Sequence, residues 1–417
     1  MMTFNEAYVW IWLPNEVEPI VAGKLEADGN NLLFNYGQSY LARLNNGMGA
    51  IPIYEPELPL KPGILPLSDG LSMPGCIRDG APDAWGRRVI INKRLGLKGA
   101  NTDTTLLNEL TYLLESGSDR IGALDFQRSA SEYVPRGASN ITLEELMNSA
   151  ERVEKGIALT PELDMALYHG SAIGGARPKA LVESGDRKYI AKFSSTTDIY
   201  SVVKAEFIAM RLAKLAGLNV ATVKLETVLN KDVLLIERFD RKRTKQGWTR
   251  QSIVSALTLF GLDDMMARYA SYETLAEIIR YRFTDPKKTL KELFARLTFN
   301  ILCGNTDDHA RNHAAFWDGQ ALSLTPAYDI CPQSRSGNEA SQAMMISGNN
   351  NLSQLKNCIK AASVFLLSQQ EADFIIERQH QVIRMNWDAV CDEAGLSLVD
   401  KKLFWKRQFL NPYAFNN

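Results

Sequence analysis

One short stretch of the sequence, residues 303–330, places several oxygen-bearing side chains beside apolar runs: CGNTDDHARNHAAFWDGQALSLTPAYDI. Asp307 precedes Asn312 by five positions, and "AAFWDGQALSL" predicts a hairpin that turns at its Asp-Gly pair. Because a hairpin folds the chain back on itself, we expect Asp329 to return close to Asn312. A carboxylate and an amide oxygen that converge suit Mg²⁺, which also keeps waters and substrate phosphates as ligands.

Two other interpretations of this stretch stay open. His309 and His313 are four positions apart, a spacing that can place two imidazoles on one helical face for zinc. However, no glutamate follows His309 directly, and asparagine and aspartate oxygens prefer a harder ion than zinc. The stretch could also be a polar loop that only covers a core.

Features elsewhere in the chain weaken the polar-loop interpretation. The five-residue step from Asp307 to Asn312 is the D-x-x-x-x-N spacing of the protein-kinase catalytic loop, where the aspartate accepts a hydroxyl proton and the asparagine holds magnesium. Lys192 ends the strand-like run "YIAK", as the phosphate-pairing lysine does in kinases. Glu206 in the next helix is a candidate ion-pair partner for it.

A glycine-containing turn, "GSAIGGARPK", precedes the lysine strand. It offers backbone amides together with Arg177 and Lys179 to phosphate oxygens. After two further strands, "LLIERFDR" lies where a hinge between lobes would run, with Glu237 and Phe239 beside the adenine edge. The order of these features predicts an ATP-dependent phosphotransferase.

The same order predicts an α+β, protein-kinase-like fold of two lobes, with an additional β-rich N-terminal subdomain and a mostly helical C-terminal lobe. Residues 1–125 are expected to form the N-terminal subdomain, including strands in 7–13 and 30–44. Residues 126–242 are expected to form the small lobe with glycine turn, lysine strand and hinge. Residues 243–417 are expected to form the helical lobe with the catalytic and metal-binding loops.

Composition excludes several function classes. The chain has 47 basic and 48 acidic residues, so its formal charge of −1 predicts no wrapping of nucleic acid. No apolar run approaches the roughly 18 residues that a membrane span needs. The five cysteines are scattered without a C-x-x-C pair, which favours ordinary thiols in a reducing, cytoplasmic environment.

Taken together, the motifs resemble the HipA family of serine/threonine kinases, the toxin halves of bacterial toxin–antitoxin pairs. The resemblance runs over nearly the whole chain and is carried by "GAPDAWGRR", "GGARPKA", "ERFDR", "NTDDHARN" and "LTPAYDI". It implies ATP and Mg²⁺ as cofactors. The site residues that it implies are the catalytic base Asp307, the magnesium ligands Asn312 and Asp329, the phosphate-contacting Lys192, the glycine-motif residues Gly174, Gly175, Arg177 and Lys179, and the hinge positions Glu237 and Phe239.

The resemblance also implies a substrate and partners. Family members phosphorylate a serine on a protein, an aminoacyl-tRNA synthetase for glutamate in the founding type, so that translation and growth halt. The implied partner is a small helix-turn-helix antitoxin, through which the kinase meets operator DNA indirectly. No membrane partner is implied.

One departure from the family pattern concerns self-phosphorylation. In the founding members an autophosphorylated serine stands directly before the "I-x-G" of the glycine motif. Here Ala172 occupies that place, and Ser171 lies one residue earlier. Ser171 is therefore either a substitute phosphorylation site or a turn residue.

Two alternatives to a protein kinase also remain at this stage. The chain could be a kinase of a small molecule, because kinase-like folds serve both substrate classes. It could also be a catalytically idle, ATP-binding co-repressor that accompanies a DNA-binding antitoxin. The complete acid and amide set argues against the idle form.

Overall fold

The computed structural model describes residues 4–95, 103–137, 141–155, 157, 171–175, 177–195, 198–335 and 337–416. The chain forms two compact units. Unit 1 comprises Met1–Thr197, Glu226–Val254 and Trp317–Gln320, and unit 2 comprises Asp198–Leu225, Ser255–Phe316 and Ala321–Asn417. The three segments expected from the sequence stay a prediction.

The N-terminal part of unit 1 is a five-stranded antiparallel sheet in the order β4-β3-β2-β1-β5. In β3, side chains alternate between buried and less buried positions, as expected where one face of a sheet packs on a core. This sheet confirms the β-rich N-terminal subdomain. Its strands are β1 (Glu6–Ile11), β2 (Ile20–Asp28), β3 (Asn31–Tyr36), β4 (Ile64–Leu65) and β5 (Leu124–Gln127).

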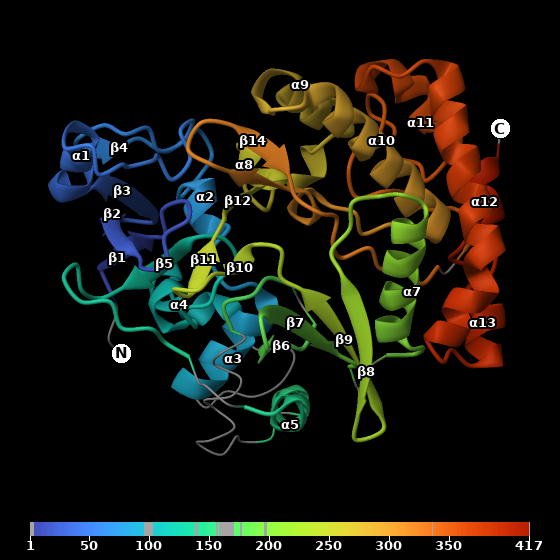
Figure 1. The fold of residues 1–417 in the computed structure, drawn as a ribbon, viewed down its shortest axis with the longest axis horizontal. Helices are drawn as coiled ribbons and strands as arrows, with labels where there is room; N and C mark the ends of the chain where they lie inside the picture. The colour runs from blue at the N-terminus through green and yellow to red at the C-terminus, as the bar shows by residue number, and fades with distance from the viewer. Residues whose placement is uncertain are drawn as a thin grey trace. The chain divides into compact units, whose positions relative to one another are not determined.

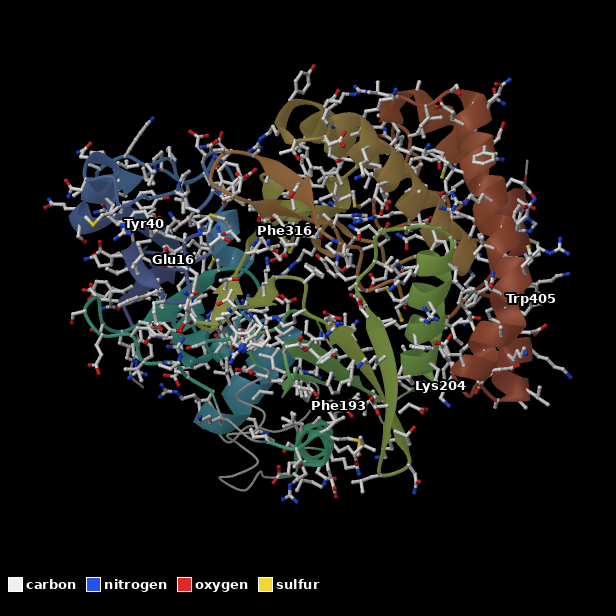
Figure 2. All side chains as sticks on the ribbon, in the orientation of Figure 1. Glu16, Tyr40, Phe193, Lys204, Phe316 and Trp405 are labelled. Atoms are coloured by element: carbon white, nitrogen blue, oxygen red, sulfur yellow. The ribbon has the colours of Figure 1, made fainter. Side chains whose placement is uncertain are left out.

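The strand expected over residues 30–44 is wrong in its second half. After β3 the chain forms the helix α1 (Gln38–Asn45). Gly37 separates the two elements, and Tyr40, labelled in Figure 2, stacks on the ring of Tyr36 at a centroid distance of 5.7 Å. The Tyr40 hydroxyl also donates a hydrogen bond to the carbonyl of Ile51. The packing of Tyr40 therefore favours a helix here, although the residues themselves have strand propensity.

A second sheet in unit 1 has the strand order β6-β7-β9-β8. Apolar residues of α3 and α5 form one buried core with β6, β7 and β9. Thr142 caps α5 with a capping box that it forms with Glu145. The elements are α2 (Gly75–Arg78), α3 (Ala84–Leu95), η1 (Thr104–Leu106), α4 (Glu109–Glu115), α5 (Leu143–Glu154), β6 (Lys179–Ser184), β7 (Arg187–Phe193), β8 (Val223–Val228), β9 (Lys231–Glu237) and the hairpin of β10 (Arg241–Arg243) and β11 (Trp248–Arg250).

A buried ionic cluster joins the turn before β5 to the segment after β9. Arg238 and Arg241 each contact both Asp119 and Asp240, at distances of 2.8–3.0 Å. Lys188 also contacts Asp119, at 2.7 Å. Burial alone would raise the pKa of Asp119 and Asp240, but attraction to Arg238 and Arg241 outweighs it, so both pKa values lie below the ordinary range.

Unit 2 is mostly helical, which confirms the expected character of the C-terminal lobe. The long helix α12 packs on α7 and α10 (Figure 1). Lys204 of α7, labelled in Figure 2, donates to the carbonyl of Gly395 at 2.8 Å, and Arg211 pairs with Glu393. The elements are α7 (Val202–Leu215), α8 (Ala256–Leu259), η2 (Ala267–Tyr269), α9 (Tyr272–Arg282), α10 (Pro286–Cys303), η3 (Ala310–Asn312), α11 (Leu355–Ala361), η4 (Ala362–Phe365), α12 (Gln369–Glu393), α13 (Leu398–Phe404) and η5 (Pro412–Phe415).

A short sheet adds β12 (Ser252–Ser255), β13 (Ala314–Trp317) and β14 (Leu322–Leu324), in the order β12-β13-β14. All five cysteines lie in the described part of the chain, and all are buried thiols. Among the described residues, none of the helices has both the length and the apolar character that crossing a bilayer requires.

Candidate active site

The loop that carries Asp307 begins where α10 ends. Gly304 takes a left-handed conformation (φ +78°), and a Cβ there would lie 2.6 Å from the carbonyl oxygen of Gln408. The next residue, Asn305, is buried and returns hydrogen bonds from its backbone and side chain to Asn300. The close approach and the left-handed turn both require glycine, so they determine where the helix stops and the loop starts.

Within the loop, Asp307 and Asn312 are directly linked. The Nδ2 of Asn312 donates to the backbone carbonyl of Asp307 at 3.0 Å. The amide nitrogen is thereby used inside the loop, and Oδ1 is the amide atom that suits a cation. The D-x-x-x-x-N spacing thus corresponds to one closed loop.

Asp329 belongs to a segment that runs beside this loop. The expected hairpin forms from β13 and β14, and Thr325 donates from its backbone to the carbonyl of Ala314 at 3.0 Å. The hydroxyl of Tyr328 then donates to the carbonyl of Arg311 at 2.8 Å. These bonds tie the residue before Asp329 to the residue before Asn312, so unit 2 brings Asp307, Asn312 and Asp329 together.

The charge environment of Asp307 reflects this gathering. Partial removal of water from its carboxylate raises the pKa of Asp307; His309 lowers it, and repulsion from Asp329 raises it further. The repulsion requires that the two carboxylates lie near one another. A divalent cation beside them would relieve it.

The raised pKa of Asp307 predicts a stability effect. A carboxyl whose folded-state pKa lies above its unfolded value binds more protons in the folded state, so stability falls as pH rises through that interval. Replacing Asp307 with asparagine removes this loss, and the variant should show a slightly higher Tm than wild type at pH 7 without nucleotide or divalent cation. Thermal unfolding followed by circular dichroism measures it. The difference should vanish below about pH 4, near the unfolded pKa; a lower Tm for the variant at pH 7 would contradict the assignment.

A buried cluster beside the loop was missed in the sequence. Asp308 directly follows Asp307, and His313 directly follows Asn312. The Nε2 of His313 lies 3.0 Å from Asp308 Oδ1, and the hydroxyl of Tyr272, on α9, donates to the same carboxylate. The cluster therefore anchors the loop directly after Asp307 and directly after Asn312. A sequence signal for this cluster was present. Asp308 and His313 are five positions apart, the same spacing as Asp307 and Asn312, and each follows one of those two residues directly.

The zinc interpretation finds no support in this arrangement. His313 Nε2 is engaged by Asp308, and the described residues contain no group of three or more His, Cys, Asp or Glu side chains that could hold a metal ion. Mg²⁺ does not need such a group, because waters and substrate phosphates supply its other oxygen ligands. One amide oxygen from Asn312 and one carboxylate from Asp329 fit that donor set.

The glycine motif lies in unit 1 and packs on the "APDAWGRR" segment; Gly170 and Ala176 of the motif lie outside the described residues. Gly175 (φ +102°) donates from its backbone to Asp83 Oδ2 at 2.6 Å, and its carbonyl accepts from Trp85 at 3.3 Å. Lys179 Nζ donates to the carbonyl of Gly174. The "APDAWGRR" segment therefore packs against this motif.

The remaining predicted residues of unit 1 lie on or after the second sheet. Lys192 on β7 is mostly buried and sits opposite Lys179 on β6 in the strand register. Arg177 and Phe239 are half-buried. Glu237 ends β9 and forms an ion pair with Arg187 at 2.6 Å. Glu206 belongs to unit 2, where it is buried on α7.

Ser171 is fully buried at the start of the described part of the glycine motif. Its Oγ accepts a hydrogen bond from the backbone of Gly117 at 3.2 Å. A Cβ added to Gly86 of α3 would lie 1.9 Å from the carbonyl oxygen of Ser171. Phosphorylation of Ser171 would require this packing to open first.

A Gly86→Ala change should therefore displace the glycine motif. Overpacking of this kind typically costs about 1–3 kcal/mol, and we expect lower unfolding stability together with weaker ADP binding. Urea unfolding and titration calorimetry measure the two effects. Gly37→Ala is the matched control, because its Cβ would meet nothing closer than 3.7 Å; equal ADP affinity for both variants would contradict the role given to this contact.

Residues 171–387, more than half of the chain, match the family described as HipA-like C-terminal domain. The serine/threonine-protein kinase toxin HipA of Shewanella oneidensis is 26% identical over 250 residues, which cover 54% of this chain and 56% of that protein. The putative kinase Y4mE of Sinorhizobium fredii is 27% identical over 271 residues, which cover 58% of this chain and 60% of that protein. The chain thus spans less than two thirds of the length of these curated relatives.

The fold of this chain is similar to one in a solved complex of the Shewanella oneidensis MR-1 toxin–antitoxin system, which contains HipA, HipB and its operator DNA. One of its chains matches with a TM-score of 0.68 at 20% identity, covering 98% of this chain and 95% of that chain. The comparison extends over the β-rich N-terminal part as well as the helical part.

The fold is that of an α+β protein of the protein-kinase-like type. The chain belongs to the HipA family, through its HipA-like C-terminal domain. This confirms the resemblance that the motifs carried. Relatives in this family bear the name kinase.

Proposed function

We propose that this chain is an ATP-dependent serine/threonine-protein kinase and the toxin component of a type II toxin–antitoxin system. The observation that carries the proposal is the closed loop of Asp307 and Asn312 with Asp329 tied beside it by the Tyr328–Arg311 bond. A proton acceptor and two oxygen donors placed together are what phosphate transfer from a magnesium nucleotide requires.

Each residue then has a role in the proposed reaction. Asp307 accepts the proton of the substrate serine hydroxyl as its oxygen bonds to the terminal phosphorus of ATP; the bond from that phosphorus to the bridging oxygen breaks, and ADP leaves. Asn312 and Asp329 would hold Mg²⁺, which would neutralise charge on the phosphate oxygens. Lys192 contacts the phosphates; the remaining nucleotide contacts come from Gly174, Gly175, Arg177, Lys179, Glu237 and Phe239.

The substrate and partners are proposed from the family. The substrate is a protein serine, an aminoacyl-tRNA synthetase being the candidate, so that phosphorylation halts translation in the cytoplasm. The partner is a small helix-turn-helix antitoxin, and the chain meets DNA through it. The solved relative that contains HipB and operator DNA supports this partner class.

The test is transfer of ³²P from ATP in the presence of Mg²⁺ and a cell extract. Label in a protein band supports a protein kinase. Label in a metabolite would instead indicate a small-molecule kinase. Nucleotide binding without any transfer would indicate the idle co-repressor.

A further inference from the structure

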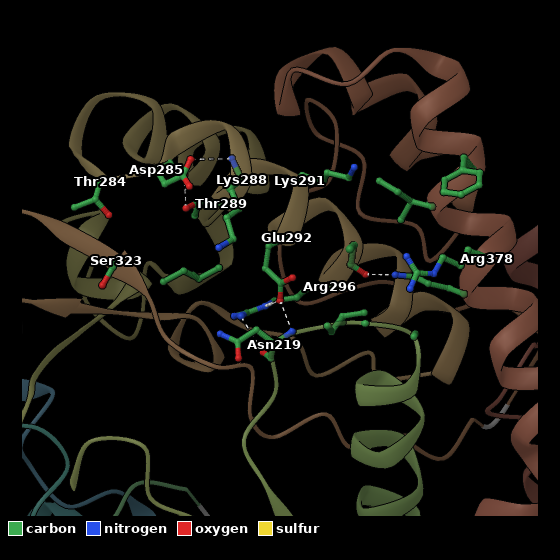
Figure 3. A pocket seen from close by; sticks show the side chains of 18 residues that line it. Asn219, Thr284, Asp285, Lys288, Thr289, Lys291, Glu292, Arg296, Ser323 and Arg378 are labelled. Atoms are coloured by element: carbon green, nitrogen blue, oxygen red, sulfur yellow. Dashed lines mark hydrogen bonds and ion pairs between the residues drawn. The ribbon is translucent and has the colours of Figure 1, made fainter. Parts of the chain in front are cut away.

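A cavity of about 430 Å³ lies inside unit 2 (Figure 3). Its walls come from the segment after α7, from α10, from β14 and from α12. Among its lining residues, Glu292 and Arg296 on α10 form an ion pair at 2.9 Å, drawn as a dashed line in Figure 3. Neither residue belongs to the site described above, but their hydrogen bonds reach the segment that precedes Asp329.

Each member of the pair also holds backbone. Glu292 Oε1 accepts a hydrogen bond from the backbone of Asn219 at 3.1 Å. The Nη2 of Arg296 donates to the carbonyl of Asn219 at 3.1 Å and to the carbonyl of Thr325 at 2.8 Å. One guanidinium therefore joins the segment after α7 to the segment after β14.

The two joined segments continue directly to Asp329. Val220 and Ala327 form a parallel bridge; Ala327 donates to the carbonyl of Asn219 at 2.8 Å, and Ala221 donates to the carbonyl of Ala327 at 2.9 Å. Asp329 follows two residues later, in a left-handed conformation with φ +58°. Because a non-glycine residue rarely adopts this conformation, its neighbours must hold the backbone there.

A purely stabilising ion pair would not need this geometry. Arg296 is buried, and its planar fork meets the Glu292 carboxylate and two carbonyl oxygens at once. A lysine at this position keeps the charge but cannot present donors in that fork. The identity of the side chain, and not only its charge, sets the spacing of the two segments.

We propose that Glu292 and Arg296 are positioning residues that hold the segment 323–329, and with it the carboxylate of Asp329, in place for a divalent cation. The inference rests on the proposed function and deepens it. Loss of the bridge lets the bridged segment shift, so the cation loses a ligand while the fold persists.

The test compares Arg296→Lys with wild type in the full-length chain. Binding of Mn²⁺ in the presence of ADP is measured by electron paramagnetic resonance, and the Mg²⁺ concentration for half-maximal phosphate transfer is measured alongside. Residues that orient a metal ligand typically change metal affinity 10–100-fold; we expect at least about a tenfold loss. Arg378→Lys is the matched control, because Arg378 lines the same cavity and is exposed on α12.

Each outcome decides the inference. Mn²⁺ affinity equal to wild type in a folded Arg296→Lys variant overturns it, as does an equal loss in Arg378→Lys. If Arg296→Lys does not fold, Mn²⁺ affinity is measured for Glu292→Ala instead, because this change removes the acceptor for the backbone of Asn219. An affinity equal to wild type then overturns the inference. If wild type binds Mn²⁺ with ADP but transfers no phosphate, the proposed function fails while the positioning role is still decided by the binding data. If wild type binds no Mn²⁺ with ADP, both fail.

Discussion

An Asp307→Asn variant should transfer phosphate from ATP about 10²–10⁴-fold more slowly than the wild-type chain, the usual contribution of a general base. In the proposed reaction the carboxylate accepts the hydroxyl proton, and an amide of the same size cannot take it. The loop itself should persist, because it is closed by the backbone carbonyl of Asp307 and not by its side chain. Loss of rate should therefore occur without loss of fold.

The measurement is initial ³²P transfer at saturating ATP and Mg²⁺, together with ADP affinity by calorimetry. Asp373→Asn is the matched control, since it makes the same change at an exposed aspartate of α12 in the same unit. We expect ADP affinity to stay within a few-fold of wild type for both variants. Transfer by Asp307→Asn at the wild-type rate would show that another group takes the proton.

Asp308→Asn separates anchoring from chemistry at the neighbouring position. Asp308 is buried and pairs with His313 and Tyr272, so its change weakens the support of the loop. The carboxylate of Asp307 instead interacts with the charges of His309 and Asp329. We therefore expect different tasks for the two adjacent aspartates, a chemical one for Asp307 and a structural one for Asp308.

The conformation of this loop depends on local determinants. The five-residue spacing sets Asn312 relative to Asp307, and the Asp-Gly turn returns the chain toward Asp329. Gly304, which stops the preceding helix, is equally local but was not predicted. The ends of other helices also depend on local determinants: Thr142 caps α5, and Gly217, with φ +91°, follows α7. Each of these signals acts within a few residues of its effect.

What escaped prediction depends on contacts between distant residues. "ERFDR" was interpreted as a nucleotide hinge, and that role for Glu237 and Phe239 stays a prediction. The structure adds that its two arginines contact Asp119, which lies 119 positions before Arg238, and that both also pair with Asp240. Nothing in the spacing of charges along the sequence shows which of them are buried together, so pairing of this kind follows only from the fold.

The second large effect is expected for this buried cluster. Replacing Asp240 with asparagine should lower the free energy of unfolding by about 3–5 kcal/mol, the usual result of removing one partner from a buried ion pair. Arg238 and Arg241 would then share only Asp119, which Lys188 also contacts. The loss should be large because both guanidinium groups are almost completely buried.

Urea unfolding at pH 7 measures this loss, with Asp186→Asn, an exposed aspartate of the same unit, as the control expected to change stability by less than about 1 kcal/mol. The pH dependence gives a second check. Because the folded-state pKa of Asp240 lies below its unfolded value, its contribution is complete above the unfolded pKa of about 3.9 and is lost as pH falls through the folded pKa. The gap between wild type and Asp240→Asn should therefore narrow as pH falls below about 4, when the wild-type carboxyl becomes neutral like the amide. A gap that stays constant with pH would mean that the variant loses packing rather than charge, and that the two arginines do not depend on Asp240 for their burial.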